Sequence, residues 1–328
     1  MRKNLFTIGL ITVLYSLIAA ICFAGIAVFV KPFMAMDIVS RLPLPPRNIP
    51  QPTISVSGNI SQDTTWYGVV RVTGDIEVSQ GVTLTISSGT VVLMDAHSDD
   101  QGWGVTASPD PVFPFDPPAD DSFVKSHIQI SINGTLLVNG QPDNMVTFTS
   151  NNPSPTTYDW HGLSISGGRS EIRYAIIEYA RYVSINSDII ISHSVIRHML
   201  EAGMLIFNAS TNSVVEHNYI YDTQHDGIKL WAASPYTHHN VIRTTKDVIP
   251  PGGWERFGIS GKGAAHEYVS FVYSGWNTFS IRENSFPIFE YNVIDGTERQ
   301  ANFVVALGAA HPIVRYNLFK NARLCRAW

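Results

Sequence analysis

Cysteine and charge are both scarce in this chain of 328 residues. Its two cysteines, Cys22 and Cys325, are too few for a disulfide framework. Charged residues make up 15% of the sequence, below the roughly 25% that is typical of soluble domains. The net charge is −5 and no run of Lys or Arg could follow a phosphate backbone. We therefore predict no nucleic-acid partner.

Lys and Glu, which favour long surface helices, are also infrequent. Instead the chain has 24 glycines, 19 prolines and 11% aromatic residues, together with many Asn, Ser, Thr, Val and Ile. These residue types favour strands and turns. We therefore predict an all-β fold.

The N-terminal segment is the exception. Residues 5–30 contain no charged side chain, and Arg2 and Lys3 precede them. A helix of this length spans about 39 Å, enough to cross a bilayer core of roughly 30 Å. We predict an uncleaved signal anchor at residues 1–31. A cleaved signal peptide is the alternative, although the sequence stays apolar to Val30. Either would export the remainder, as a membrane-anchored or secreted domain.

The exported part divides into a spacer and a folded domain. Residues 32–52 hold six prolines, which predict an extended spacer without helix. Residues 53–328 are predicted to form the folded domain.

A repeated pattern runs through this domain. Each copy has two polar or aromatic positions, a small residue or Asn, and two mostly apolar positions. The six copies are 172–177, 191–196, 215–220, 237–242, 289–294 and 314–319. Their central positions are separated by 19, 24, 22, 52 and 25 residues. A repeat near 22 residues suits three short strands, which is one coil of a parallel β-helix. The interval of 52 is interpreted as two coils with an excursion.

Four copies have Asn at the centre. Coils stack about 4.8 Å apart, so the same corner recurs directly above itself. An Asn at that corner can bond unpaired backbone groups and the Asn of the next coil. Asn also tolerates a left-handed backbone. We predict a structural ladder of Asn218, Asn240, Asn292 and Asn317, with Ala175 and Ser194 as its small N-terminal members.

These repeats resemble those of right-handed parallel β-helix proteins with the pectin-lyase-like architecture, over about residues 54–328. The segments 65–68, 74–78, 81–86, 89–92 and 132–140 are similar to the opening coils of exported surface proteins of this kind. The resemblance implies the fold but not one activity, because its members include polysaccharide lyases and hydrolases, uronan epimerases and non-enzymatic adhesins. Only nine residues follow the last recognisable coil, and none resembles a cap. We expect a truncated chain or a partner that covers this end.

One cluster predicts catalysis. Asp222, His225, Asp226 and Lys229 lie close in sequence, and His238 follows one coil later. A lyase needs a cation near a uronate and a base, whereas a hydrolase needs two carboxylates. The alternative is a structural turn, in which Asp bonds local backbone and Gly supplies positive φ. The Asp-Asp and Gly-His-Gly signatures of polygalacturonases are absent. We favour the turn.

Aromatic residues predict a carbohydrate surface. Two loop excursions are predicted, at 95–121 and 244–285, and long loops often carry ligand contacts. The candidate contacts are side chains that could stack on sugar rings or bind their hydroxyls: Trp231, Trp254, Trp276, Tyr273, Glu255 and Arg256.

Metal binding is not predicted. The acidic residues of 95–121 could hold Ca²⁺, but they lack the spacing of a known calcium motif, and we favour a solvated loop. The turn pattern accounts for His217, His238 and His239, so no cofactor is expected.

The sequence thus favours an exported cell-surface β-helix that binds carbohydrate or another surface without catalysis. A polysaccharide lyase or glycoside hydrolase is the first alternative. A structural surface or filament subunit that self-associates end to end is the second.

Overall fold

The computed structural model divides the chain into two compact units, Met1–Arg47 and Asn48–Trp328. It describes residues 48–101, 126–223, 226–243, 277–282, 284–295, 301–306 and 310–327. The predicted signal anchor lies outside the described residues. Within them, no helix with the length and hydropathy to cross a bilayer is found.

Every described strand pairing of the second unit is parallel, in an 18-stranded and a nine-stranded sheet. The larger sheet consists of two strips, and β1 (Ile54–Ile60) and β3 (Val69–Val78) run through both. The first strip continues with β5 (Val91–Met94), β8 (Val146–Ser150), β11 (Ala175–Glu178), β14 (Val195–Met199), β17 (Tyr219–Thr223), β20 (Val241–Arg243), β23 (Val293–Asp295) and β26 (Leu318–Lys320). The second strip continues with β6 (Gln129–Ile132), β9 (Trp160–Ile165), β12 (Ala180–Ile185), β15 (Met204–Phe207), β18 (Ile228–Trp231), β21 (Asn277–Arg282), β24 (Ala301–Ala306) and β27 (Ala322–Ala327).

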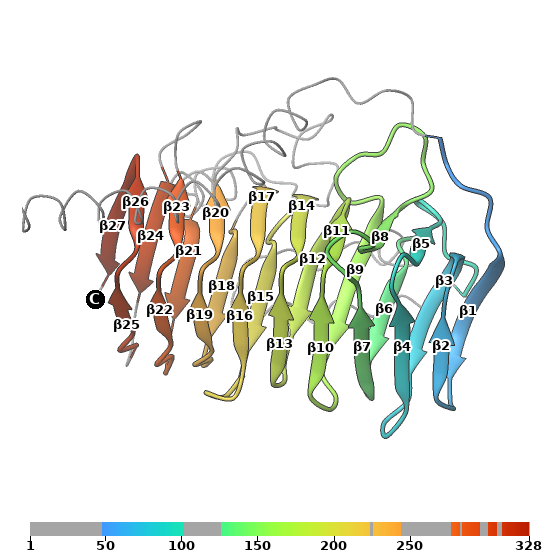
Figure 1. The fold of residues 1–328 in the computed structure, drawn as a ribbon, viewed down its shortest axis with the longest axis horizontal. Coiled ribbons are helices and arrows are strands. Elements are labelled where there is room, and N and C mark those ends of the chain that lie inside the picture. The colour runs from blue at the N-terminus through green and yellow to red at the C-terminus, as the bar shows by residue number, and fades with distance from the viewer. Residues whose placement is uncertain are drawn as a thin grey trace, which may run out of the picture. The chain divides into compact units, whose positions relative to one another are not determined.

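The nine-stranded sheet consists of β2 (Thr64–Trp66), β4 (Thr83–Ser87), β7 (Thr135–Asn139), β10 (Ser170–Arg173), β13 (Ile189–Ser192), β16 (Val214–Glu216), β19 (Tyr236–His238), β22 (Ile288–Glu290) and β25 (Ile313–Arg315). The chain passes in turn through this sheet, the first strip and the second strip, and then begins the next coil (Figure 1). This all-β arrangement of stacked coils is consistent with a parallel β-helix.

The core consists of columns of apolar side chains, one from each coil. In the first strip, five isoleucines follow one another in register and are each 0% exposed: Ile177, Ile196, Ile220, Ile242 and Ile294. Full burial of such a side chain stabilises a fold by about 1.5–3 kcal/mol. Successive side chains of a strand point to opposite faces, so the residues before and after each isoleucine point to the outer face.

The interval of 52 residues is one coil, not two. β19 pairs directly with β22, and β20 pairs directly with β23. The backbone N–H of Asn240 donates to Asn292 Oδ1 at 2.9 Å, so these two corners are neighbours. Because no coil lies between them, residues 244–276 belong to the connection from β20 to β21. The other predicted excursion connects β5 to β6, so both connect the first strip to the second.

The four asparagines form a continuous chain of hydrogen bonds at the corner between the nine-stranded sheet and the first strip. The N–H of Asn218 donates to Asn240 Oδ1, and the N–H of Asn292 donates to Asn317 Oδ1, at 3.0 and 2.8 Å. Each side-chain Nδ2 also donates to the carbonyl oxygen of a neighbouring strand end. Ser194 continues the chain, since its Oγ accepts from the N–H of Ala175. Asn218, Asn240 and Asn292 are buried, and the ladder satisfies their polar groups.

The left-handed residue of each corner is not the asparagine. It is the residue before it, with φ between 50° and 57°, in all six copies: Tyr174, His193, His217, His239, Tyr291 and Tyr316. The left-handed conformation that Asn tolerates is therefore adopted by the residue before it. The asparagine side chain instead supplies the hydrogen bonds that the turned backbone leaves open.

Candidate functional site

The predicted catalytic residue Asp222 is part of a corner contact. It lies in β17 with a φ of 53°, where the first strip turns toward the second. Its carboxylate pairs with Nδ1 of His198, one coil earlier, and the Asp222 side chain is 32% exposed. The His198 ring also stacks on Tyr179, with 5.0 Å between ring centroids. Asp222 thus links consecutive coils.

Asp226 and Lys229 are closed to solvent. Asp226 is 0% exposed and Lys229 is 1% exposed. Ile228 and Leu230 are core residues, so the alternation of β18 places Lys229 on the outer side of the second strip, between Leu205 and Ser280 of the adjacent strands. In this conformation neither side chain is presented to a polymer on the surface. His225 lies outside the described residues.

His238 lies away from Asp222. It ends β19 in the nine-stranded sheet, before the corner that leads into β20. The stacked corner and Asp222 are separated by the length of β17, about 13 Å for four strand residues. The structure therefore brings His238 together with Glu216, His217 and His239, and not with Asp222.

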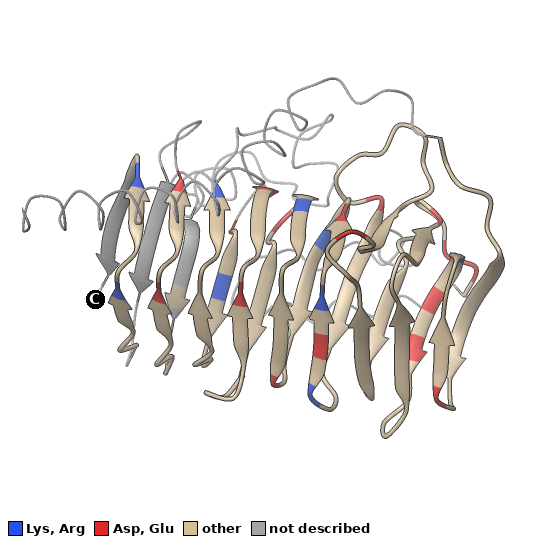
Figure 2. Ribbon diagram, viewed as in Figure 1, with Lys and Arg blue, Asp and Glu red and all other residues tan. Residues whose placement is uncertain are grey.

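Charges on the outer face of the first strip are matched to each other. Thr149 Oγ1 donates to Glu178 Oε1, and Arg197 Nε donates to Glu178 Oε2, both at 2.7 Å. Arg197 Nη1 donates to the Tyr221 hydroxyl at 2.9 Å. Burial lowers the pKa of Arg197, but Glu178 and Tyr221 outweigh it and raise the pKa above its usual value. Charged residues are spread along the strands with both signs interspersed (Figure 2). These side chains bind one another and link adjacent strands, so they are more consistent with a structural role than with a catalytic acid and base.

A second polar network, which the sequence did not predict, surrounds the start of β9. His97 Nε2 lies 3.2 Å from Asp159 Oδ1, and His97 Nδ1 lies 2.9 Å from His127 Nε2. The His161 ring nitrogens contact the hydroxyls of Tyr158 and Tyr182 at 3.1 and 3.2 Å. Burial, and then Arg181, lower the pKa of His161 to about 3, so it is neutral at pH 7.

This network was missed because its members are far apart in sequence. Only the strand register brings residues 97, 127 and 159 together. The carboxylates at the start of the predicted acidic excursion have protein donors: Asp95 binds Arg71, and Asp100 accepts from Thr73. The rest of that loop, up to residue 121, lies outside the described residues.

Trp231 lies next to another aromatic side chain. It is partly exposed at the end of β18, and its register partner in β15 is Phe207, which is also partly exposed. The preceding residues, Ile206 and Leu230, are core residues, so both aromatics are on the outer face. Phe207 was not among the residues predicted from the sequence to contact carbohydrate. The other predicted carbohydrate contacts lie outside the described residues: Trp254, Glu255, Arg256, Tyr273 and Trp276.

The left-handed corner residues carry a stack of six rings. From Tyr174 to Tyr316, successive ring centroids are 4.7 to 5.2 Å apart and the planes are within 28° of parallel. Each inner ring covers the faces of its neighbours, so these faces are not open to a sugar ring. The stack supports coil-to-coil packing.

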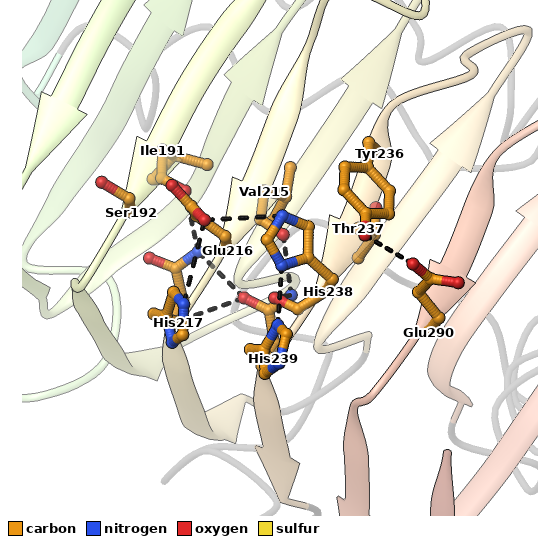
Figure 3. Close-up of polar contacts among 12 residues, drawn as sticks. Ile191, Ser192, Val215, Glu216, His217, Tyr236, Thr237, His238, His239 and Glu290 are labelled. Carbon is orange, nitrogen blue, oxygen red and sulfur yellow. Dashed lines mark hydrogen bonds and ion pairs between the residues drawn. The ribbon is translucent and has the colours of Figure 1, made fainter. Parts of the chain in front are cut away.

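Three histidines gather where this stack meets β19 (Figure 3). In the part of the chain that the structure describes, His217, His238 and His239 are the one group of three or more potential metal ligands with converging atoms. Burial lowers the pKa of His217 and His238, and neighbouring imidazoles lower that of His217 further. In the same two strands, β19 and β22, the hydroxyl of Tyr236 donates to the Glu290 carboxylate. This hydrogen bond raises the pKa of Tyr236 to about 12.

No protein-family model, curated protein or solved structure matches this chain.

Proposed function

We propose that residues 53–328 form a right-handed parallel β-helix of the pectin-lyase-like kind, exported on the apolar segment 5–30, that binds carbohydrate without cleaving it. The parallel coils support this architecture. The right-handed sense follows from the general preference of parallel crossover connections.

One observation carries the binding proposal: Phe207 and Trp231 are adjacent in register on the outer face of the second strip and both are partly exposed. Neighbouring strands are about 4.8 Å apart, close to the width of one sugar ring. Two aromatic side chains at this spacing provide an apolar surface for the C–H face of a sugar. Such aromatic surfaces are typical of ligand sites.

The absence of cleavage is proposed from the state of the charged groups. Glu178 and Arg197 bind each other, Asp222 binds His198, and Asp226 and Lys229 are buried. A hydrolase needs two carboxylates that reach the substrate, one of them able to donate a proton.

The test uses the purified full chain on immobilised acidic and neutral polysaccharides. Retention, new reducing ends and unsaturated products are recorded together. We expect retention without cleavage, and at least about tenfold weaker retention for Trp231→Ala and for Phe207→Ala, about 1.4 kcal/mol. Tyr67→Ala is the matched control, because Tyr67 is 70% exposed on an early turn.

Retention that both variants leave unchanged would contradict the binding site. Cleavage that Asp226→Asn abolishes, with an unchanged melting temperature, would replace this proposal by the lyase or hydrolase. Neither retention nor cleavage, with concentration-dependent assembly, would support the structural subunit.

A further inference from the structure

The histidine corner has a feature that the repeated turn does not explain. His217 and His239 are left-handed corner residues within the ring stack, with 4.9 Å between their centroids. His238 is not part of that stack. It belongs to β19, and its ring stands edge-on to both others, at 81° to His217 and 84° to His239. Neither the left-handed turn nor the stack requires a histidine at position 238.

The ring nitrogens converge on one point. His238 Nδ1 is 2.8 Å from His239 Nδ1, and one ligand nitrogen from each of the three histidines lies within 4.8 Å of the others. In a tetrahedral site with bonds of 2.0–2.1 Å, ligand nitrogens are about 3.3 Å apart. The separation of His238 Nδ1 and His239 Nδ1 is somewhat shorter than this value, and all three ligand nitrogens lie within 4.8 Å of one another.

Glu216 is placed to orient His238. The two residues are register partners on the neighbouring strands β16 and β19, which belong to adjacent coils. Glu216 Oε2 is 3.4 Å from His238 Nε2 and 3.9 Å from His217 Nε2. A carboxylate beside Nε2 favours the tautomer with its proton there, which leaves the Nδ1 lone pair toward His239. Metal-binding histidines commonly have such a carboxylate behind them.

We propose that His217, His238 and His239 bind one divalent transition-metal ion of the Zn²⁺ type, with Glu216 as the carboxylate that orients His238. Imidazole nitrogens suit Zn²⁺, Co²⁺, Ni²⁺ and Cu²⁺, whereas Ca²⁺ and Mg²⁺ require oxygen ligands. Three protein ligands leave a fourth position for water or for an external ligand. The ion would join two adjacent coils, because His217 comes from one coil and His238 and His239 from the next. This site is independent of the proposed carbohydrate surface.

The test is titration of the metal-free full chain with Zn²⁺ by calorimetry, and with Co²⁺ by visible absorption. We expect one equivalent of Zn²⁺ with a dissociation constant of about 1 µM or lower, and the ligand-field bands of a four-coordinate Co²⁺ complex. His239→Asn and His238→Gln should weaken Zn²⁺ binding at least about 100-fold. Glu216→Gln should weaken it about tenfold, as loss of such an orienting group does elsewhere.

The matched control is His193→Asn. His193 has the same backbone conformation, with a φ of 52°, and stacks on His217, but it does not belong to the three-histidine group. Asn tolerates this conformation at positions 193 and 239. His193→Asn should retain Zn²⁺ affinity within about threefold. Melting curves recorded in chelator show whether each variant folds. If a histidine variant does not fold, the Zn²⁺ affinity of Glu216→Gln tests the proposal instead.

Three results would each overturn the proposal. These are wild-type binding weaker than about 100 µM, a Co²⁺ spectrum of the hydrated ion, and an equal loss of affinity in His193→Asn and His239→Asn.

Discussion

The left-handed corner residues are histidines and tyrosines, although Gly or Asn adopts this conformation with less strain. A left-handed backbone costs an ordinary residue about 1–2 kcal/mol. Each of these rings contacts at least one ring of an adjacent coil, and an aromatic pair contributes about 0.5–1.5 kcal/mol. The stack therefore offsets part of the strain, and its inner members have two such contacts each.

Asp75 is a residue whose charge opposes folding. It is 8% exposed, and Oδ1 accepts the N–H of Gln129 at 2.6 Å. Burial, followed by Asp99 and Asp100, raises its pKa to about 6. Because the folded-state pKa lies above the unfolded value of about 3.9, the folded protein holds this proton more tightly. Its contribution to stability is present below pH 4 and is lost as the pH rises through about 6.

We expect Asp75→Asn to raise the free energy of unfolding by about 1–2 kcal/mol at pH 7.5, and to leave it nearly unchanged at pH 3.5. Urea unfolding at both values measures the difference. Asp188→Asn is the opposite case, because hydrogen bonds from Ser210 and Ser213 outweigh burial and lower the pKa of Asp188. It should destabilise the protein at pH 7.5. Equal effects of the two substitutions would contradict this assignment.

The sequence supports some residue assignments and not others. Asn218 and Asn240 were identified because the same corner recurs in every coil. The burial of Lys229 was not predicted, since an outward position in an alternating strand normally predicts exposure. His238 and Asp222 are close in sequence, but they lie at opposite ends of the strands of the first strip. Their separation can be seen only once those strands are placed.

At the scale of elements, the asparagine ladder closes the corner that every coil must make. Asn240 Oδ1 accepts from both the N–H and the Nδ2 of Asn218, and Asn240 Nδ2 donates to Val215 O at 2.9 Å. Asn240 itself is 0% exposed. Water therefore does not replace these partners in the folded state, and a buried group that loses its partner costs about 1–3 kcal/mol.

Asn240→Ala should lower the free energy of unfolding by about 3 kcal/mol, because the N–H of Asn218 loses its acceptor. Asn240→Ser should cost about half as much. Ser194 shows the reason: its Oγ accepts from the N–H of Ala175 at 3.1 Å, as an asparagine does one coil further on. Chemical denaturation of the three proteins measures this. If Ala and Ser cost the same, the side-chain acceptor is not what stabilises the corner.

The strands were more predictable than their connections. A strand needs only a few alternating residues and a register with its neighbours, and the repeat supplies both. The 52-residue interval was misassigned because a long connection and an additional coil contain similar numbers of residues. The direct pairing of β20 with β23 decides between them.

At the scale of the whole second unit, each described coil pairs only with the coils before and after it. Stability is then close to a sum of coil and interface contributions. Buried side chains are not distributed evenly: β13 has the pattern of a core strand, whereas all three side chains of β26 are exposed. The unit is expected to open locally where side chains are least buried.

Amide hydrogen exchange should therefore be slowest in β10 to β17 and at least about tenfold faster in β25 and β26, since each 1.4 kcal/mol of local stability is a factor of ten. Exchange followed by mass spectrometry of peptides covers these strands. Uniform protection from β4 to β26 would mean that the coils unfold as a single cooperative unit.

The asparagine ladder also gives the solenoid a direction. Each N–H and Nδ2 on one coil donates to the oxygen of the following coil, from Asn218 through Asn240 and Asn292 to Asn317. The side-chain dipoles are thus aligned, and aligned hydrogen bonds polarise one another. Between Asn218 and Asn317, a duplicated or transplanted coil would continue the ladder only if its corner offered an acceptor backward and donors forward. The asparagine thereby sets which coils could be exchanged without breaking the ladder.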